Sequence, residues 1–224
     1  MRKLILKMSM SLDGFVAGPN GEADWIFRSQ SDDSTAWTVE SLWQAGLHAM
    51  GSRTYRDMAS YWPTATDLFA APMNEIPKIV FTRQNPFDPH AGDTTTALRD
   101  AKQARQAQGG APAQEPSPGA ANWASARIAN GDLAEEMQRL KQEPGKDILA
   151  HGGAGFARSL TQLGLIDEYR LLIHPVAIGS GLSLFSGLRQ PIDLKLVSTS
   201  VFQSGAVAHV YLPANAAQPS HGEN

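Results

Sequence analysis

Cysteine is absent from this 224-residue sequence. Its absence excludes disulfide bonds, zinc sites built on thiolates and cysteine nucleophiles. Long hydrophobic runs are also absent, since no apolar stretch approaches the roughly 20 residues that a helix needs to span a bilayer. Lys7 interrupts the apolar run at the start, and no small-residue cleavage site follows. We therefore interpret the start as a first strand, and expect a cytoplasmic protein with no membrane partner.

A strong charge of one sign is lacking as well. The formal net charge is −3, and no basic stripe with interleaved aromatic residues occurs, so no nucleic-acid partner is expected. The histidines are scattered and carboxylates do not cluster with them, so no metal site is predicted. The length and the 42% hydrophobic content suit one globular domain, which we place at residues 1–213 before a flexible tail at 214–224.

Strand-like and helix-like segments alternate along the chain. Residues 3–10, 47–50, 78–81 and 147–151 are short apolar runs, which predict buried strands, and residues 195–212 have the pattern of a hairpin. Segments with helical spacing lie between them, so the fold class is α/β. Residues 100–122 are rich in Ala, Gln, Gly and Pro and lack large apolar side chains, which predicts a mobile surface loop, with a frayed helical turn at residues 98–107 as an alternative for its start.

Three of the predicted strands end in groups that suit a phosphate. Residues 51–54 supply a glycine, a cation and two hydroxyls, and Thr82 and Arg83 supply a hydroxyl and a guanidinium. Residues 152–155 are a glycine turn at a helix start, where free N–H groups and the helix dipole attract an anion; the alternative is a simple tight turn. Because ligands collect at the carboxyl ends of strands in α/β sheets, we expect the three segments to meet in one cleft.

The motifs around these segments resemble those of a known superfamily. SLDGFVA, GSRTY, FTR, HGGAGF and LIDEYRLLIHPVAIGSGLSLF occur in the order and spacing of the dihydrofolate reductase superfamily. They are most similar to the branch that includes the carboxyl-terminal reductase domain of the bifunctional riboflavin-biosynthesis enzyme. The resemblance covers most of residues 2–212, outside the loop near 100–122. It implies a mixed, mostly parallel sheet flanked by helices and finished by an antiparallel carboxyl-terminal hairpin.

The resemblance also implies a reduced nicotinamide dinucleotide, usually NADPH. The two glycine junctions would hold its pyrophosphate and adenosine side, the third segment its 2′-phosphate, and two residues after the first strand would lie along the nicotinamide. In relatives the two adjacent glycines of HGGAGF are joined by a cis peptide, and we expect the same here. The cofactor-binding residues so implied are Val16, Ala17, Gly51, Ser52, Arg53, Thr54, Thr82, Arg83, Gly152, Gly153, Ala154, Gly155 and Phe156.

The residues themselves favour NADPH over NADH. NAD sites commonly offer a carboxylate to the ribose diol, and no acidic residue ends the third predicted strand. Thr82 and Arg83 stand there instead, and both suit a phosphate.

Hydride transfer also requires a proton or charge stabilisation on the acceptor. In dihydrofolate reductases a single carboxylate shortly after a tryptophan supplies it. Here Trp25 is in place and Asp32 or Asp33 lies a few residues further on, although both also suit a helix cap. Asp13 of the SLDG motif is a third catalytic candidate; it contacts the substrate, shapes the loop over the nicotinamide, or forms an Asx turn with Gly14.

The expected partner is a small heteroaromatic acceptor, pterin-like or pyrimidine-like. Trp25, Tyr61 and Trp62 are candidates to line a flat apolar pocket, with core packing as the alternative. The riboflavin enzyme has an Asp-x-Pro-Leu-Thr-like segment for its sugar phosphate, and residues 55–58 of this chain, Tyr-Arg-Asp-Met, depart from it. The alternative function is a non-catalytic NADP(H)-binding or small-ligand-binding protein of the same fold. Relatives often dimerise, so a homodimer is a further expectation.

Overall fold

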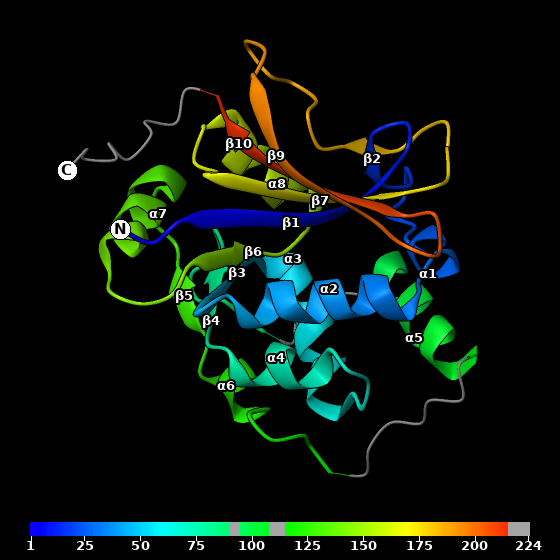
Figure 1. Cartoon of the computed structure of the whole chain (residues 1–224). Coiled ribbons are helices and arrows are strands. Elements are labelled where there is room, and N and C mark those ends of the chain that lie inside the picture. The colour runs from blue at the N-terminus through cyan, green and yellow to red at the C-terminus, as the bar shows by residue number, and fades with distance from the viewer. Residues whose placement is uncertain (90–94, 108–114, 215–224) are drawn as a thin grey trace, which may run out of the picture.

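The computed structural model describes residues 1–89, 95–107 and 115–214. Its centre is an eight-stranded sheet in the order β5-β4-β3-β6-β1-β7-β10-β9 (Figure 1). The six strands from β5 to β7 are parallel, and β10 and β9 add an antiparallel hairpin. The strands are β1 (Leu4–Ser11), β3 (Leu47–Gly51), β4 (Lys78–Phe81), β5 (Arg127–Ala129), β6 (Ile148–Ala150), β7 (Glu168–His174), β9 (Leu194–Val201) and β10 (Val207–Pro213). The mixed, mostly parallel sheet with its carboxyl-terminal hairpin is confirmed.

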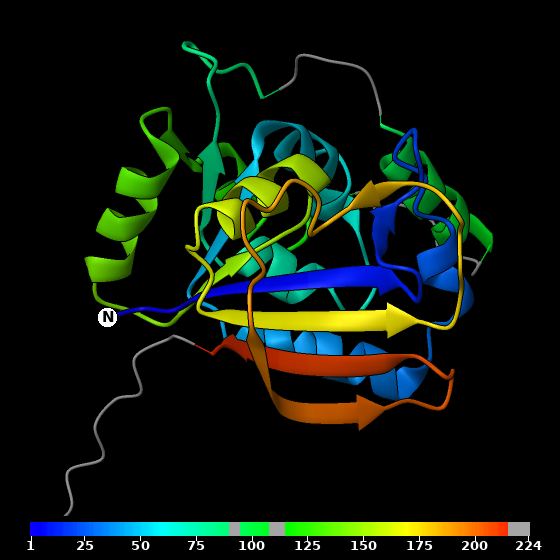
Figure 2. The ribbon, with the colours of Figure 1, turned by 90° about the horizontal axis from the view of Figure 1, so that it is seen from above.

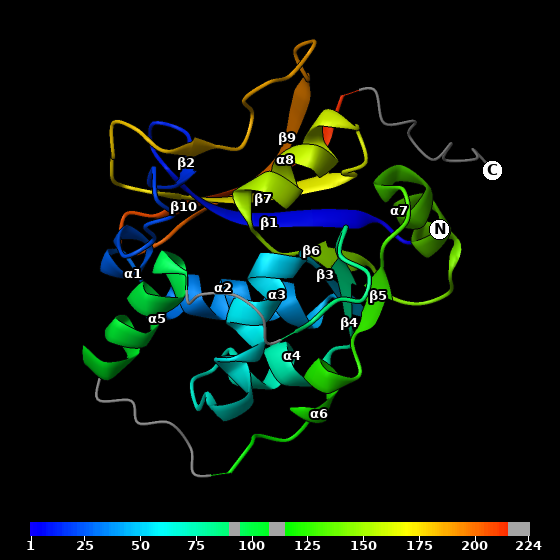
Figure 3. The ribbon, with the colours of Figure 1, turned by 180° about the vertical axis from the view of Figure 1, so that it is seen from behind.

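Helices cover both faces of the sheet, which makes three layers. α2 (Asp32–Trp43), α3 (Ser52–Ala59), α4 (Ala70–Glu75) and α6 (Ala121–Ala124) share one hydrophobic cluster with strand residues such as Ile5 and Val80. α7 (Leu133–Gln142) and α8 (Ala154–Gln162) pack on the other face, against residues such as Leu4 and Ile148. Figure 3 shows α7 and α8 on one side of the strands and α2, α3 and α4 on the other. The alternation of side chains along each strand explains how one strand serves both clusters.

Local sequence signals account for the helix boundaries. Asp132 caps α7, since its Oδ1 accepts hydrogen bonds from the N–H groups of Ala134 and Glu135. In α8 the buried residues are Ala157, Leu160 and Thr161. Leu163, the first residue after α8, is 52% exposed.

Smaller elements lie at the carboxyl ends of the central strands. β2 (Phe15–Ala17) pairs antiparallel with β8 (Leu182–Ser183), and Figure 2 shows the long connection after β7 that brings β8 beside β2. α1 (Trp25–Arg28) and the 3-10 helix η1 (Trp62–Thr64) complete this end of the molecule.

Within the loop predicted over residues 100–122, the helical turn expected at residues 98–107 is a full helix, and residues 121–122 belong to α6. α5 (Thr96–Ala107) extends to Ala107, Leu98 is buried, and Arg105 Nη2 donates to the Thr64 carbonyl oxygen at 3.0 Å. Ala, Gln and Arg are good helix formers, so one buried leucine and one polar contact suffice to position a helix of this composition. Residues 108–114 of the predicted loop and 215–224 of the predicted tail lie outside the described residues. Among the described helices, none is long and apolar enough to cross a membrane.

Candidate functional site

A cleft of about 1480 Å³ opens where β3, β4, β5 and β6 end. Its lining includes the residue at or just after each of these carboxyl ends: Gly51, Thr82, Ala129 and His151. Twelve of the thirteen predicted cofactor residues line it, and Thr54 is the exception. The three predicted segments therefore meet in one cleft, as the strand order of an α/β sheet requires.

The junction between β3 and α3 supplies the first wall. Gly51 precedes the helix in an extended conformation, and Ser52 and Arg53 begin α3 while lining the cleft. No described side chain caps the N-terminus of α3. The N–H groups of its first turn are thus open to an anion in the cleft, where the helix dipole also favours negative charge.

The junction between β6 and α8 supplies the opposite wall. Gly152 and Gly153 form the turn, and Ala154, Gly155 and Phe156 begin α8. Here too no described side chain caps the helix. The cis peptide expected between Gly152 and Gly153 is wrong: the cis bond among the described residues is Asn85–Pro86. The turn is instead made by the positive φ of Gly153, 109°, which glycine adopts readily because it has no Cβ.

Close backbone packing holds the two junctions together. A Cβ at Gly153 would clash with Thr54 Oγ1, and a Cβ at Gly51 would lie 3.2 Å from Phe156 Cβ. The rings of Phe81 and Phe156 stack with centres 5.3 Å apart. Thr54 thus packs against the turn at Gly153. The small size of Gly51 and Gly153 lets the N-termini of α3 and α8 lie close enough to contact one ligand. This arrangement fits a diphosphate.

The segment after β4 completes the lining. Thr82 is buried and its Oγ1 accepts a hydrogen bond from the Gln84 N–H at 3.0 Å, while Arg83 is exposed at the rim. Neither Arg83 nor Arg53 forms an ion pair or hydrogen bond with the described residues. Their guanidinium groups are therefore available to an anion in the cleft.

Val16, Ala17 and Lys7 line the cleft near β1. Burial lowers the pKa of Lys7 to about 8, so the amine remains mostly protonated at neutral pH. Sequence reasoning used Lys7 only to reject a signal peptide. The signal that could have found it is a lysine within a mostly apolar strand. Burying a charged amine is costly, so a lysine in such a strand is a candidate for a functional site.

Asp13 does not line the cleft but shapes the chain beside it. Its carboxylate accepts hydrogen bonds from the Ser11 hydroxyl at 2.6 Å and the Gly179 N–H at 2.7 Å, with Ile178 N–H at 3.2 Å. The Ser11 and Gly179 bonds lower the pKa of Asp13, which keeps it ionised. The loop-shaping interpretation therefore describes its contacts, and a carboxylate held in this way is unsuited to donate a proton.

Asp32 and Asp33 likewise lie away from the cleft lining. They begin α2, where negative charge is favourable. Asp33 Oδ1 accepts from the Ser31 hydroxyl at 2.6 Å, and its Oδ2 accepts from the Gln203 N–H at 2.9 Å. These bonds, the Ser31 one foremost, lower the pKa of Asp33. Their position at the helix start fits the helix-cap alternative, and a catalytic role for either residue stays a prediction.

Trp25, predicted to contact substrate, is instead a core residue. It is 3% exposed and packs edge-on against His174, with ring centres 5.4 Å apart. His174 Nδ1 pairs with Ser29 Oγ at 2.7 Å, and burial lowers its pKa to about 4. His151 lines the cleft, and burial, aided by the charges of Lys7 and Lys78, lowers its pKa to about 3. Both histidines are therefore neutral at pH 7.

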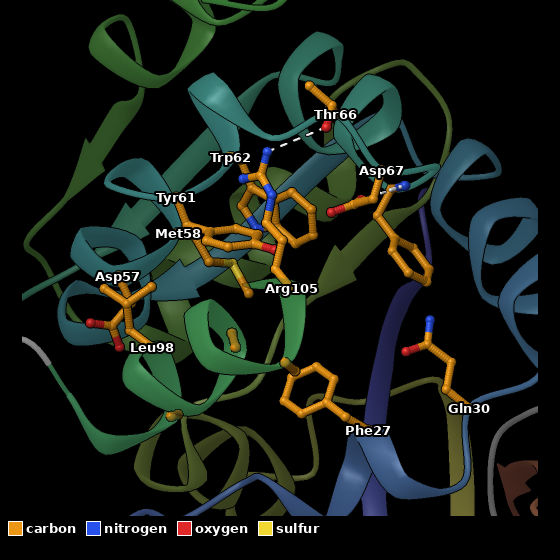
Figure 4. A pocket seen from close by; sticks show the side chains of 14 residues that line it. Phe27, Gln30, Asp57, Met58, Tyr61, Trp62, Thr66, Asp67, Leu98 and Arg105 are labelled. Atoms are coloured by element: carbon orange, nitrogen blue, oxygen red, sulfur yellow. Dashed lines mark hydrogen bonds between the residues drawn. The ribbon is translucent and has the colours of Figure 1, made fainter. Parts of the chain in front are cut away.

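Tyr61 and Trp62 line a second cavity, of about 410 Å³, as predicted for a substrate pocket. Figure 4 shows their rings beside Met58, with Arg105 above Tyr61 and with Phe27 on the opposite side. The two rings meet edge-on with centres 4.8 Å apart. Asp57, Met58 and Ala97 line both this cavity and the cleft, so the two spaces are neighbours.

Asp57 is a carboxylate that sequence reasoning did not select. It stands where the cleft meets the second cavity, and its Oδ2 accepts a hydrogen bond from the Thr95 hydroxyl at 2.5 Å. Burial raises its pKa, and the Thr95 hydrogen bonds oppose the shift. Asp57 therefore lies in the site, and its raised pKa favours the protonated form that a proton donor needs.

The family model of the RibD C-terminal domain matches residues 2–208. The fold and the cleft at its strand ends agree with that match, and the chain belongs to the RibD C-terminal domain family. A similar protein is YyaP of Bacillus subtilis (strain 168), an uncharacterized protein that is 32% identical over 217 residues, with 94% of each chain covered.

Two solved structures share the fold. A putative riboflavin biosynthesis protein from Shewanella sp. PV-4 has a TM-score of 0.64 at 17% identity, with 95% of this chain and 99% of that chain covered. A diaminohydroxyphosphoribosylaminopyrimidine deaminase/5-amino-6-(5-phosphoribosylamino)uracil reductase from Thermotoga maritima has a TM-score of 0.61 at 17% identity. That match covers 95% of this chain and 57% of the larger enzyme.

Proposed function

We propose that this protein is an NADPH-dependent reductase that transfers a hydride to a small heteroaromatic acceptor, pterin-like or pyrimidine-like. The observation that supports the proposal is the shared cleft, which two uncapped helix N-termini and the segment after β4 line together. Membership of the RibD C-terminal domain family supports a reductase, and the Thermotoga maritima relative is named as one.

Each wall of the cleft has a separate task in this proposal. The N–H groups at the starts of α3 and α8 bind the pyrophosphate, and Thr82 and Arg83 bind the 2′-phosphate that distinguishes NADPH from NADH. Val16 and Ala17 lie along the nicotinamide, which supplies the hydride when the cofactor is bound. Asp57, at the entrance to the second cavity, is positioned to hold a proton for the acceptor.

Melting temperature measured against increasing NADPH and NADH tests the proposal. A ligand that binds only the folded state stabilises it by about 2.7 kcal/mol at a concentration one hundred times its Kd. We expect a concentration-dependent rise with NADPH and a smaller one with NADH. No rise with either dinucleotide would reject the reductase assignment.

A second candidate is a non-catalytic NADP(H)-binding or small-ligand-binding protein. It is favoured by one observation: the three carboxylates expected to act in catalysis, Asp13, Asp32 and Asp33, do not line the cleft. The two candidates are separated by mixing protein and NADPH with a panel of pterins, deaminated pyrimidines and quinones. Loss of NADPH absorbance that requires one of these compounds would reject the non-catalytic candidate.

A further inference from the structure

The cavity beyond Asp57 carries an inference about the acceptor, which rests on the proposed function. We propose that this cavity binds the hydride acceptor as a flat, fused-ring aromatic compound that carries no phosphate group. The sugar-phosphate substrate named for the Thermotoga maritima enzyme would therefore not be the substrate of this chain.

The lining of the cavity suits an aromatic ring system. Side chains of Phe27, Met58, Tyr61, Trp62 and Phe69 line it. Figure 4 shows the first four of these around one space. Aromatic side chains favour ring ligands through offset and edge-on contacts as well as through apolar burial. A volume of about 410 Å³ lies in the ordinary range for small-molecule sites and accommodates a two-ring compound.

The charges of the cavity disfavour an anion. Its lining contains the carboxylates of Asp57 and Asp67 and the guanidinium of Arg105. Arg105 Nη2 already donates to the Thr64 carbonyl oxygen at 3.0 Å and to Thr66 Oγ1 at 3.3 Å, and the guanidinium lies 5.4 Å from the centre of the Tyr61 ring. A phosphate in the cavity would face the carboxylate of Asp67, and also that of Asp57 whenever Asp57 has given up its proton, and it would compete with bonds that Arg105 has already formed. Like charges in a partly buried site disfavour binding strongly.

Helix α5 keeps the space open. Ala97, Ala101 and Ala104 line the cavity at positions i, i+4 and i+7, the spacing that places three side chains on one helix face. Ala107, in the same helix, is exposed and does not line it. A phenylalanine at position 101 would fill the cavity, whereas the same change at 107 would not.

The cavity and the cleft share lining residues. Because Asp57, Met58 and Ala97 belong to both, the cavity adjoins the cleft in which the cofactor is proposed to lie. The phosphate-binding groups of the protein are then reserved for the dinucleotide, and the aromatic groups for the acceptor.

Isothermal titration calorimetry with a matched pair of probes tests the inference. α-Naphthol and α-naphthyl phosphate share one ring system and differ by the phosphate, and both are titrated into protein saturated with NADP⁺ so that the phosphate site of the cleft is filled. We expect α-naphthol to bind and α-naphthyl phosphate to bind at least about tenfold more weakly. Equal or tighter binding of the phosphate, or no binding of α-naphthol, would overturn the inference.

Two variants locate the binding. Ala101→Phe should weaken α-naphthol binding by about tenfold or more while NADP⁺ affinity and melting temperature stay near those of the unmodified protein. Ala107→Phe is the matched control, and it should leave the α-naphthol affinity, the NADP⁺ affinity and the melting temperature unchanged. Full α-naphthol affinity in a folded Ala101→Phe protein would place the probe elsewhere and overturn the inference.

A third variant tests the charge argument. Asp67→Asn keeps an acceptor for the Phe69 N–H, which Asp67 Oδ1 binds at 2.9 Å, but removes one negative charge. It should narrow the difference between the two probes, and an unchanged difference would overturn the electrostatic part of the inference. Failure of NADP⁺ to bind would instead count against the proposed function, since the probes can also be titrated into the free protein.

Discussion

Gly153→Ala tests the packing of the two glycine junctions. The φ of Gly153 is 109°, and the added Cβ would clash with Thr54 Oγ1. Left-handed backbone alone costs an L-residue about 1–2 kcal/mol, and relief of the clash must also move Thr54 or the turn. We expect a total loss of about 2–3 kcal/mol in the free energy of unfolding, together with weaker NADPH binding because the N-termini of α3 and α8 would separate.

Gly155→Ala is the matched control, since it makes the same chemical change two residues later. Gly155 lies within α8, has no positive φ, and its added Cβ would have no described atom within 4 Å. Alanine is favoured over glycine inside a helix by about 1 kcal/mol, so this variant should be as stable as the unmodified protein or slightly more so.

Urea unfolding and NADPH calorimetry on both variants give the result. A Thr54→Ala change in the Gly153→Ala background should restore the part of the loss that comes from the clash and leave the backbone part, so the double-mutant cycle separates the two. A Gly153→Ala protein with unchanged stability and NADPH affinity would refute the account of this turn.

The remaining predictions concern the adenosine end of the cleft, the buried histidines and the sheet edge. Arg83→Gln should weaken NADPH binding about tenfold and leave NADH binding unchanged, because only NADPH carries the 2′-phosphate; equal losses in calorimetry would contradict this. Burial, with the charges of His151 and Lys78, lowers the pKa of His48. The folded state therefore binds fewer protons than the unfolded state below about pH 6.5, and stability should fall on acidification by up to about 1.4 kcal/mol per pH unit for such a histidine. His48→Leu should flatten that fall in urea unfolding at pH 7 and pH 5, and an unchanged slope would contradict the assignment. Finally, edge strand β9 leaves Val197 55% and Val201 74% exposed, so we propose that a homodimer covers it; a monomeric mass in light scattering would remove the dimer.

Much of the fold could be predicted from local pattern. Strands such as β1 and β4 are mostly apolar because helices cover both of their faces, and Asp132 marks the start of α7. β5 could not be predicted, because it has three residues and two of them are exposed. The sequence predicts only a frayed helical turn at residues 98–107, and the full α5 could not be predicted because its alanines face a cavity and lack the large apolar side chains that reveal a buried helix face.

The site, like the fold, has residues that the sequence predicts and residues that it does not. The phosphate-binding segments could be predicted because glycine, hydroxyl and guanidinium groups occur directly after strands, and the topology of a parallel sheet brings such positions together. Asp57 could not be predicted as a site residue, because an aspartate in an amphipathic helix is ordinarily a surface residue. Only tertiary packing against Thr95 and the contact between two cavities distinguish it. The prediction that Trp25 contacts the substrate was wrong, because a tryptophan beside a loop suits a core as well as a pocket.

A crystal structure of the protein with NADP⁺ tests the central claim most directly. It should show the pyrophosphate between the N-termini of α3 and α8, in hydrogen-bond contact with N–H groups of residues 51–54 and 152–156, and the 2′-phosphate beside Thr82 and Arg83. A dinucleotide bound outside this cleft, or bound in it with its 2′-phosphate remote from Arg83, would contradict the account.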